Sequence, residues 1–302
     1  MDPGRVSVVI PLYNHRHYIT QAFESVLLQG NDVKELIVID DGSRDESAAV
    51  MDRLAERDSR VRFLRQENQG AHATINRGLG LTSGEFVTIL NSDDAYAPGR
   101  FAALIRALDL DPGSSIAASA IAFMDGDGRP TSNPWFDDAL KHFKSTRDFA
   151  VAMIDANFLM TTSNFFMRRT VLEKLGGFAP LRYAHDLDFA LRWAAQGMRL
   201  CFIDRPLIHY RFHATNTISE NHNKVRVEWA LCAAVFLRLK YGASLSVDTP
   251  QYQAILQTLD RHGLRRGTEC ALTWLQQCDL HGVNAALLGD AKFMADMLQA
   301  IA

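Results

Sequence analysis

Two pairs of aspartates follow two short apolar runs of the sequence. Asp40-Asp41 comes directly after residues 36–39, and Asp93-Asp94 comes after residues 85–90 and two polar residues. Carboxylates about 4 Å apart repel each other by about 4 kcal/mol at an effective dielectric of 20. Such crowding is tolerated where the carboxylates bind a cation, accept backbone hydrogen bonds or face water. Because Mg²⁺ held by one or two carboxylates keeps positions open for a phosphate, the pairs indicate a nucleotide-diphosphate site.

Each pair has a simpler structural explanation. Asp41-Gly42 is typical of a turn, and Asp94 is typical of a helix cap. For either pair alone this explanation is slightly favoured. Two pairs that follow successive strands of one sheet favour the site, with one pair for the nucleoside and the other for the metal.

The elements that position these aspartates alternate between apolar runs and amphipathic segments. The pattern predicts strands over 6–10, 36–39, 61–64 and 85–90, and helices over 18–28, from 70 to between 78 and 84, and over 98–108. A further helix is predicted to open with a capping box, Ser43-Arg-Asp-Glu46. Uniformly apolar strands separated by helices predict an α/β fold with a mostly parallel, Rossmann-like sheet flanked by helices. Ligands of such sheets bind beyond the carboxyl ends of the strands, where both aspartate pairs lie.

The pattern changes after residue 110. We expect a strand over 115–124, a turn over 125–128, a mixed loop over 131–144 with Trp135 and Phe136 exposed, and a strand over 161–167. A helix ending at Gly176-Gly177, a helix over 186–196 and two strands within 199–213, broken at 204–206, follow. The pattern of the C-terminal residues predicts a helical extension with helices over 224–241, 250–262, 267–280 and 283–300. We place a soft domain boundary near 220, giving a main domain over 1–220 and a helical region over 221–302.

Composition narrows the function classes. The 302 residues are 47% hydrophobic and 22% charged, as in a globular protein with a sizeable core. The net charge of −3 gives no positive field for nucleic acid, and no apolar run approaches the roughly 20 residues of a membrane span. The N-terminus lacks a secretory signal pattern, and the four cysteines lack a C-x-x-C pair, so we expect a cytoplasmic protein with reduced thiols. The first strand is followed by neither G-x-G-x-x-G nor a P-loop, which weakens a dehydrogenase or P-loop assignment.

Nine short motifs, in this order, resemble those of the family 2 glycosyltransferases of GT-A fold. The resemblance covers roughly residues 5 to 220. The motifs are Val8-Val-Ile-Pro-Leu-Tyr-Asn14, Val38-Ile-Asp-Asp-Gly-Ser43, Asn68-Gln-Gly70, Asn76-Arg-Gly78, Gly84-Glu85, Leu90-Asn-Ser-Asp-Asp94, Leu175-Gly-Gly-Phe178, His185-Asp-Leu-Asp188 and Tyr210-Arg-Phe-His213.

The resemblance implies a role for each matching position. Asp93 matches the ligand of Mn²⁺ or Mg²⁺, with His213 completing the metal shell, and Asp186 matches the base that deprotonates the acceptor hydroxyl. Asp41 matches the carboxylate that binds the pyrimidine edge, and Arg211 matches a group that closes over the diphosphate. Donor contacts are implied for Pro11, Tyr13, Asn14, Asp40, Asp41, Asn76, Asn91, Ser92, Asp94 and Arg211, and acceptor contacts are assigned to Trp135 and His185.

Three positions depart from the family pattern. Asn91 stands where many members have the first Asp of D-x-D-D, so it offers an amide for a ribose hydroxyl but no charge. His185 replaces a frequent Glu before the base, and Ile75 replaces a frequent Arg. Since Asp93 and Asp186 are both kept, we expect an active enzyme.

Several of these residues also have local explanations. Asp186 begins a predicted helix, where the dipole stabilises any carboxylate and keeps it ionised near neutral pH. Asp188 and Arg192 are four apart and are expected to pair. Arg211 and His213 face opposite ways on a regular strand, so both serve one site only if the strand ends before them.

The remaining aromatic and histidine residues receive simpler assignments. We expect His15, His17 and His72 in solvated loops, although His72 is within reach of a phosphate, and we expect Trp193 in the core. Residues 229–241 fit either an interfacial membrane helix or, as favoured, a packed helix or homodimer surface.

Three functions remain open at this point. The first is an inverting, metal-dependent glycosyltransferase that uses a UDP-sugar or related donor and a glycan or lipid-linked acceptor in cell-surface polysaccharide synthesis. It would act in the cytoplasm or at the inner face of the membrane. The second is a sugar nucleotidyltransferase, for which residues 11–17 lack the expected glycines. The third is a decayed nucleotide- or glycan-binding module, suggested by Asn91 and His185.

Overall fold

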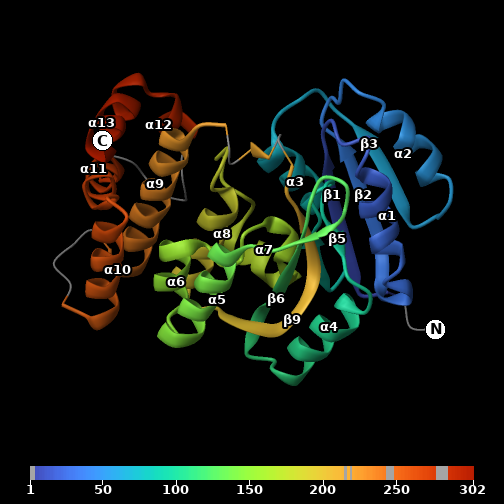
Figure 1. Ribbon diagram of the computed structural model, residues 1–302, viewed down its shortest axis with the longest axis horizontal. Helices are drawn as coiled ribbons and strands as arrows, with labels where there is room; N and C mark the ends of the chain where they lie inside the picture. Colours follow the sequence, from blue (N-terminus) through green and yellow to red (C-terminus); the bar gives the residue numbers. More distant parts are fainter. Residues whose placement is uncertain (1–3, 214–215, 218–219, 243–247, 277–284) are drawn as a thin grey trace. The chain divides into compact units, whose positions relative to one another are not determined.

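The computed structural model describes residues 4–213, 216–217, 220–242, 248–276 and 285–302 (Figure 1). The chain forms two compact units, whose segments alternate along the sequence. The first unit comprises Met1–Ser132, Thr161–Gly177 and Arg199–His213. The second comprises Asn133–Met160, Phe178–Met198 and Ala214–Ala302. The single boundary expected near 220 therefore differs from the observed division, because two internal segments join the C-terminal helices in the second unit.

The N-terminal half of the first unit is built from parallel β-α-β units, as predicted. Its strands are β1 (Val6–Leu12), β2 (Val33–Asp40), β3 (Val61–Arg65) and β4 (Phe86–Ile89), and its helices are α1 (Ile19–Leu27), α2 (Ser47–Ala55), α3 (Ala71–Gly80) and α4 (Arg100–Leu110). Strand β1 pairs in parallel with both β2 and β4, and β2 pairs in parallel with β3. The apolar side chains of β1 are completely buried, as expected for a central strand covered on both faces.

The rest of the sheet is mixed. It contains β5 (Ala95–Tyr96), β6 (Ser114–Met124), β7 (Pro130–Thr131), β8 (Phe166–Arg168) and β9 (Arg199–Arg211), in the order β3-β2-β1-β4-β8-β6-β9-β5 with β7 on β6. Strand β6 pairs in parallel with β9, whereas the short strands β5, β7 and β8 are antiparallel to their neighbours, so the sheet is mostly parallel, as predicted. Strand β8 is antiparallel to both β4 and β6. The chain enters β8 from the second unit, so no β-α-β crossover fixes its direction.

Strand β9 is continuous where two strands were predicted. Its pairing with β6 jumps from Ser119–Ile203 to Ala120–Pro206, so Asp204 and Arg205 form a bulge. A bulge accommodates Pro206, which would otherwise remove a ladder hydrogen bond. As a result β9 continues past the expected break and delivers Arg211 and His213 to the edge where β4 ends.

Two local predictions in the first unit are wrong. Helix α2 begins at Ser47 with Glu46 as its N-cap and no side-chain capping bond, so the capping box does not form. Ser43 Oγ instead accepts a hydrogen bond from the backbone N–H of Asn14, 2.9 Å away. The strand predicted over 161–167 is a short 3-10 helix, Thr162–Asn164, followed by β8, whereas α7 (Arg169–Leu175) ends before Gly176-Gly177 as expected.

The second unit is helical. It contains α5 (Pro134–Thr146), α6 (Phe149–Ala156), α8 (His185–Ala195), α9 (His222–Tyr241), α10 (Pro250–Arg261), α11 (Arg265–Leu275), α12 (Ala285–Gly289) and α13 (Ala291–Ile301). Parts of the helices predicted over 267–280 and 283–300, namely 277–280 and 283–284, lie outside the described residues.

Helix α5 replaces the loop predicted over 131–144. The Asn133 side chain accepts from the backbone N–H of Phe136 at 3.3 Å, and Pro134 occupies the first turn, which is a standard helix start. Trp135 is 49% exposed as expected, whereas Phe136 is buried because it lies on the inner face of the helix. Trp193 is completely buried, which confirms its core assignment.

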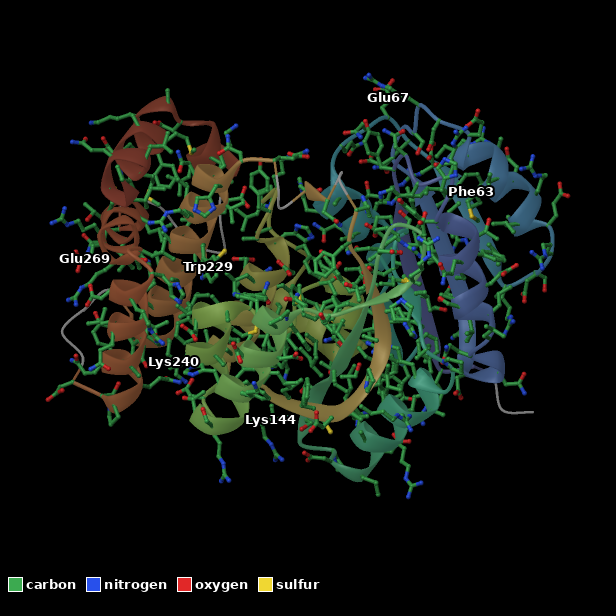
Figure 2. All side chains as sticks on the ribbon, viewed as in Figure 1. Phe63, Glu67, Lys144, Trp229, Lys240 and Glu269 are labelled. Atoms are coloured by element: carbon green, nitrogen blue, oxygen red, sulfur yellow. The ribbon has the colours of Figure 1, made fainter. Side chains whose placement is uncertain are left out.

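Helix α9 carries the segment for which a membrane contact was considered. Its apolar run from Ala230 to Leu237 is buried within the second unit, and Trp229 Nε1 donates to the backbone oxygen of Ile154 at 2.9 Å. Lys240, labelled with Trp229 in Figure 2, is exposed at the end of the helix. These contacts support the packed-helix interpretation. Within the described part of the chain, every helix is too short or too polar to cross a membrane.

Candidate active site

The ends of β2 and β4 flank the end of β1. The backbone N–H of Asp41 donates to Leu12 O at 2.8 Å, and that of Leu90 donates to Val9 O at 2.9 Å. Both aspartate pairs thus follow strands that are hydrogen-bonded to β1 and leave the sheet at one edge, as the sequence predicts.

The connection from β1 to α1 is held against the residues that follow β2. Asn14 has a φ of 54°, in the left-handed region that Asn tolerates. Its Oδ1 accepts from the backbone N–H of Arg44 at 2.8 Å, and the backbone N–H of His15 donates to Ser47 Oγ at 2.9 Å. Pro11 lies half-buried at the end of β1, and Tyr13 is 40% exposed.

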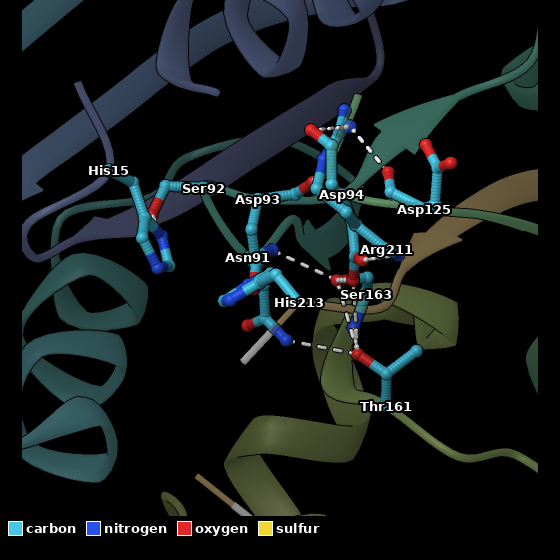
Figure 3. Close-up of polar contacts among 11 residues, drawn as sticks. His15, Asn91, Ser92, Asp93, Asp94, Asp125, Thr161, Ser163, Arg211 and His213 are labelled. Atoms are coloured by element: carbon cyan, nitrogen blue, oxygen red, sulfur yellow. Dashed lines mark hydrogen bonds and ion pairs between the residues drawn. The ribbon is translucent and has the colours of Figure 1, made fainter. Parts of the chain in front are cut away.

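His15 points from this connection to the residues after β4 (Figure 3). Its Nδ1 lies 2.7 Å from Ser92 Oγ, and its ring contacts the ring of His213 edge-on, with 5.6 Å between centroids. The expectation of a solvated loop histidine is therefore wrong. The sequence signal was its position three residues after the end of a buried strand, at the sheet edge where ligands bind.

Asp93 is contacted by both predicted residues of the β9 end. His213 Nε2 lies 2.9 Å from Asp93 Oδ2, and Arg211 Nε donates to Asp93 O at 2.8 Å. Both residues reach one site because β9 ends at Arg211 and His213 follows it outside the strand. This arrangement resolves the problem of their opposite orientations on a regular strand.

One nitrogen of each histidine, from His15 and His213, and one oxygen of Asp93 lie within 4.8 Å of one another. Imidazole nitrogen with a carboxylate oxygen is a donor set that transition-metal dications accept. The three side chains come from three different chain segments, so the fold and not local sequence brings them together. The residues present therefore fit a divalent cation.

The charges in this cluster shift one another's protonation. Burial alone raises the pKa of Asp93, but the hydrogen bond with His213 and the charges of His15 and His213 outweigh it, so the pKa is lowered overall. Burial lowers the pKa of His15. Asp93 is thereby favoured as a carboxylate and His15 as a neutral imidazole, which are the forms that bind metals.

Asp94 faces inward and has a different role from Asp93. Its carboxylate accepts from Ser163 Oγ at 2.7 Å and from the backbone N–H of Arg211 at 3.1 Å. Burial, followed by the charge of Asp93, raises the pKa of Asp94 well above its usual value. Asp94 therefore ties the end of β4 to β9 and to the segment before β8.

The Asn91 side chain is hydrogen-bonded to the segment before β8, as Asp94 is. Its Nδ2 donates to Thr161 Oγ1 at 3.0 Å, and its Oδ1 accepts from Thr162 Oγ1 at 3.0 Å. The amide that replaces the expected carboxylate thus fits a pair of threonines that the motif analysis did not single out.

The Arg211 guanidinium is buried and braces the site. It donates to Asp125 O at 3.1 Å and to Gln21 Oε1, and it lies over the Tyr18 ring, 4.7 Å from the centroid. With its bond to Asp93 O, this side chain fixes the backbone of the candidate metal ligand.

The side chains of Asp40 and Asp41 are hydrogen-bonded to backbone N–H groups of nearby loops. Asp41 accepts from the backbone N–H groups of Gln69 and Gly70, both at 2.9 Å. Asp40 Oδ2 accepts from the backbone N–H of Ser43 at 3.2 Å, while its buried Oδ1 has no hydrogen-bond partner among the described residues.

Asn76 lies on α3, and its side chain lies close to Gly177, which follows α7. A Cβ at Gly177 would lie 2.4 Å from Asn76 Oδ1, so the second glycine of Leu175-Gly-Gly-Phe178 leaves room for this side chain. Ile75, the departure from the family pattern, is completely buried.

Three predicted residues belong to the second unit. Asp186 is buried at the start of α8, where its Oδ1 accepts from the backbone N–H of Leu187 at 2.8 Å and its Oδ2 from Asn157 Nδ2 at 3.0 Å. Burial raises the pKa of Asp186, although the charge of His185 and these hydrogen bonds oppose the change. The helix start therefore does not lower this pKa, in contrast to the dipole argument. His185 contacts the Phe178 ring, and Trp135 lies on α5.

Glu228 was missed by the sequence analysis. It is buried on α9, and its carboxylate accepts from three consecutive backbone N–H groups that precede α8. A glutamate directly before the apolar run of a helix, between Val227 and Trp229, is the signal that marks it, since such a charge is rarely buried without partners.

Comparison with known proteins identifies relatives of this chain. A family model described as Glycosyl transferase family 2 matches residues 7–176, more than half of the chain. The putative glycosyltransferase EpsH of Bacillus subtilis is 26% identical over 231 residues, which cover 74% of this chain and 66% of EpsH, just under two thirds of its length.

Two solved structures are similar in fold. S. aureus TarS 1–349 in complex with UDP-GlcNAc has a TM-score of 0.59 and 18% identity, over 98% of this chain and 89% of that chain. The mannosyltransferase PcManGT from Pyrobaculum calidifontis, in complex with GDP-Man and Mn²⁺, has a TM-score of 0.56 and 20% identity, over 99% of this chain and 85% of that chain. This likeness confirms the predicted α/β fold with flanking helices.

Proposed function

Since the chain belongs to glycosyl transferase family 2, we propose that it transfers a sugar from a nucleotide-diphosphate donor to a hydroxyl group. The donor is a UDP-sugar, the acceptor is a glycan or lipid-linked sugar, and the product contributes to a cell-surface polysaccharide. The observation that most supports this proposal is that Asp93, His213 and His15 lie together at the sheet edge. Asp40 and Asp41 follow a strand that ends at the same edge. The sugar nucleotides bound to TarS and PcManGT support this choice of donor class.

In this proposal Asp93 and His213 hold Mn²⁺ or Mg²⁺. When bound, such a cation neutralises the donor diphosphate and stabilises it as a leaving group. Arg211 and Asp94 keep Asp93 in place through the bonds described above. Pro11, Tyr13, Asp40 and Asp41 border the nucleoside pocket, and the buried Asp40 Oδ1 supports this because it has acceptor capacity left.

Asp186 is the catalytic base of the proposed reaction. Its carboxylate takes the proton of the acceptor hydroxyl while that oxygen forms a bond to the anomeric carbon and the bond to the diphosphate breaks. One displacement inverts the anomeric configuration and needs no second carboxylate. The raised pKa of Asp186 supports the role, because a base works best when its pKa approaches the working pH.

Two residues are assigned to the acceptor. Trp135 stacks on the acceptor sugar, and His185 orients it. Residues 1–220 then carry the donor, metal and catalytic residues, and Glu228, from residues 221–302, supports the start of the helix that carries Asp186. We propose a cytoplasmic location for the reaction.

Thermal unfolding with nucleotides tests the donor assignment. UDP with Mn²⁺ should raise the Tm, and GDP and TDP should raise it less, because a ligand stabilises by RT ln(1 + [L]/Kd). Asp93→Asn should abolish the Mn²⁺-dependent part of the shift. Asp127→Asn, at an aspartate that is 70% exposed, is the matched control and should keep it. If UDP, GDP and TDP all leave the Tm unchanged with Mn²⁺ present, the proposal fails.

The Asp186→Asn variant tests catalysis. Sugar transfer and donor hydrolysis should collapse while the UDP-induced Tm shift persists. Retained transfer would reject Asp186 as the base. An inactive wild-type chain that still binds UDP with Mn²⁺ would favour the decayed binding module.

A further inference from the structure

We propose that His15 is a third protein ligand of the divalent cation and makes the site prefer Mn²⁺ over Mg²⁺. The inference rests on the proposed metal dependence and extends it to a residue outside the predicted ligand pair. Three observations carry it: the position of the ring, the partner of its Nδ1, and the way its backbone is held.

The ring lies where a ligand must lie. A nitrogen of His15, a nitrogen of His213 and an oxygen of Asp93 are within 4.8 Å of one another, so one ion can contact all three. The two imidazole rings meet at 84°, which lets both present nitrogens to a common point without stacking.

Ser92 selects the nitrogen that is available. Its Oγ lies 2.7 Å from His15 Nδ1 and engages that atom, which leaves Nε2 to bind the ion. Metal-binding histidines typically donate their other N–H to an oxygen, which fixes the tautomer and the ring orientation. Ser92 is buried and directly precedes Asp93, so the same loop supplies one ligand and orients another.

The backbone of His15 is fixed before any ion binds. Its N–H donates to Ser47 Oγ at 2.9 Å, and its carbonyl accepts from the N–H groups of Tyr18 and Ile19 at 3.0 and 2.9 Å. Ser47 is completely buried. A histidine held in this way loses little freedom on binding, unlike an exposed loop histidine.

The donor set decides the metal preference. Mg²⁺ favours carboxylates, phosphates and water, and binds imidazole poorly, whereas Mn²⁺ tolerates mixed nitrogen and oxygen ligands. A second imidazole moves the balance towards Mn²⁺.

Pulsed electron paramagnetic resonance of Mn²⁺ in the nucleotide-free, full-length wild-type protein tests the ligand count directly. Couplings from two directly bound imidazole nitrogens are expected. Coupling from a single imidazole would overturn the proposal. Because no sugar transfer is measured, this result is independent of whether the proposed reaction occurs.

His15→Asn gives the matched variant, because its amide nitrogen can replace Nδ1 in the bond to Ser92 while Nε2 is lost. The Kd for Mn²⁺, measured from the signal of free Mn²⁺, should rise at least about tenfold. The excess of Mg²⁺ needed to displace Mn²⁺ should fall. His17→Asn changes an exposed histidine of the same segment and should leave both values unchanged.

The alternative is that His15 donates a hydrogen bond to a phosphate. In that case His15→Asn would weaken UDP binding in EDTA and leave the Kd for Mn²⁺ unchanged, which would reject the proposal. If His15→Asn melts below the wild type in EDTA, His15→Gln is compared in the same way, and the wild-type spectrum decides the ligand count without any variant.

Discussion

The carboxylate of Glu228 holds the backbone of Ala184, the residue directly before α8. Glu228 Oε2 accepts from the N–H of Ala184 at 2.9 Å and from that of Tyr183 at 2.7 Å, and Oε1 accepts from that of Arg182 at 3.0 Å. The first N–H groups of a helix lack partners within it and carry partial positive charge. A buried glutamate from α9 therefore fixes the chain two residues ahead of Asp186.

Glu228→Gln tests this positioning role. The amide has one acceptor oxygen, and its NH₂ group faces N–H donors, so the start of α8 should shift. Because a displacement of about 1 Å can cost about a hundredfold in rate, we expect kcat to fall by about ten- to a hundredfold with the donor KM unchanged. The Tm should also fall. Steady-state kinetics over a range of donor concentrations measures both constants.

Glu220→Gln is the matched control for this variant. Glu220 contacts Arg182 through an exposed ion pair, with the two side chains 42% and 59% exposed. It should leave kcat and Tm nearly unchanged. A Glu228→Gln protein with a lowered Tm and a wild-type kcat would show that Glu228 stabilises the fold without positioning the base.

Asp186→Asn should raise the stability at neutral pH while it abolishes transfer. Folding raises the pKa of Asp186 above 3.8, so the protonated carboxyl stabilises the folded state at low pH, and this contribution is lost as the pH rises through the folded pKa. For each unit by which the pKa in the folded state exceeds that in the unfolded state, the ionised carboxylate lowers the free energy of unfolding by about 1.4 kcal/mol. An asparagine avoids the buried charge, and the buried Asn157 Oδ1, without a partner among the described residues, can accept from its amide.

Thermal unfolding from pH 4 to pH 8 measures how the stability difference between Asp186→Asn and the wild type changes with pH. The Tm of Asp186→Asn should exceed that of the wild type at pH 7, and the difference should shrink towards pH 4. Asp127→Asn should show no such trend. A difference that is constant across the pH range, or that grows in acid, would contradict the burial argument.

Asp188→Asn should destabilise the protein strongly. Asp188 Oδ2 accepts from Arg192 Nε at 2.7 Å, and the two side chains are 0% and 8% exposed. Removing one charge of a buried pair leaves the other without compensation and costs roughly 3–5 kcal/mol. Denaturant unfolding measures this loss.

The control is Asp111→Asn, which breaks an exposed pair with Arg199 of the same 2.7 Å length. Exposed pairs contribute about 0–1 kcal/mol, so its free energy of unfolding should stay close to wild type. Equal effects of the two substitutions would show that burial does not set the value of these pairs.

Two glycines of α3 should respond to alanine in opposite directions. A Cβ at Gly78 would lie 2.3 Å from Val9 Cγ1, because the helix packs directly on β1. Gly78→Ala should therefore destabilise by about 1–3 kcal/mol, as overpacking does. Gly80, exposed and with no atom within 4 Å of a built Cβ, should gain about 0.5–1 kcal/mol on substitution by alanine. Chemical denaturation compares the two variants, and a stabilising Gly78→Ala would refute the close packing.

Continuous apolar runs explain why the sequence predicts β1, β2 and β4 and the edge that carries both aspartate pairs. Periodicity depends on local residues, and β1, β2 and β4 follow local patterns. The antiparallel direction of β8 and the bulge in β9 depend on pairing with distant segments. No local pattern specifies the direction of β8, and Pro206 marks an irregularity at 204–206 but does not distinguish a bulge from a break.

The candidate site likewise has residues that local motifs predict and residues that only contacts between distant segments reveal. Asp93 and His213 match family motifs, and the structure brings them to 2.9 Å. His15 was assigned to a solvated loop, and its contacts with Ser92 and His213, which come from distant parts of the chain, show otherwise. Glu228 acts on residues more than forty positions earlier in the chain, which sequence spacing does not indicate. The roles of Asp41, Arg211 and Trp135 towards ligands stay predictions.

The interleaving of the two units limits how this protein can be recombined. Residues 133–160 and 178–198 leave the first unit and return to it, so the second unit is not an appended tail. A chimaera that exchanges only residues after 220 would separate Glu228 from the helix start it supports. A transfer of the second unit to another protein would therefore need all three of its chain segments together.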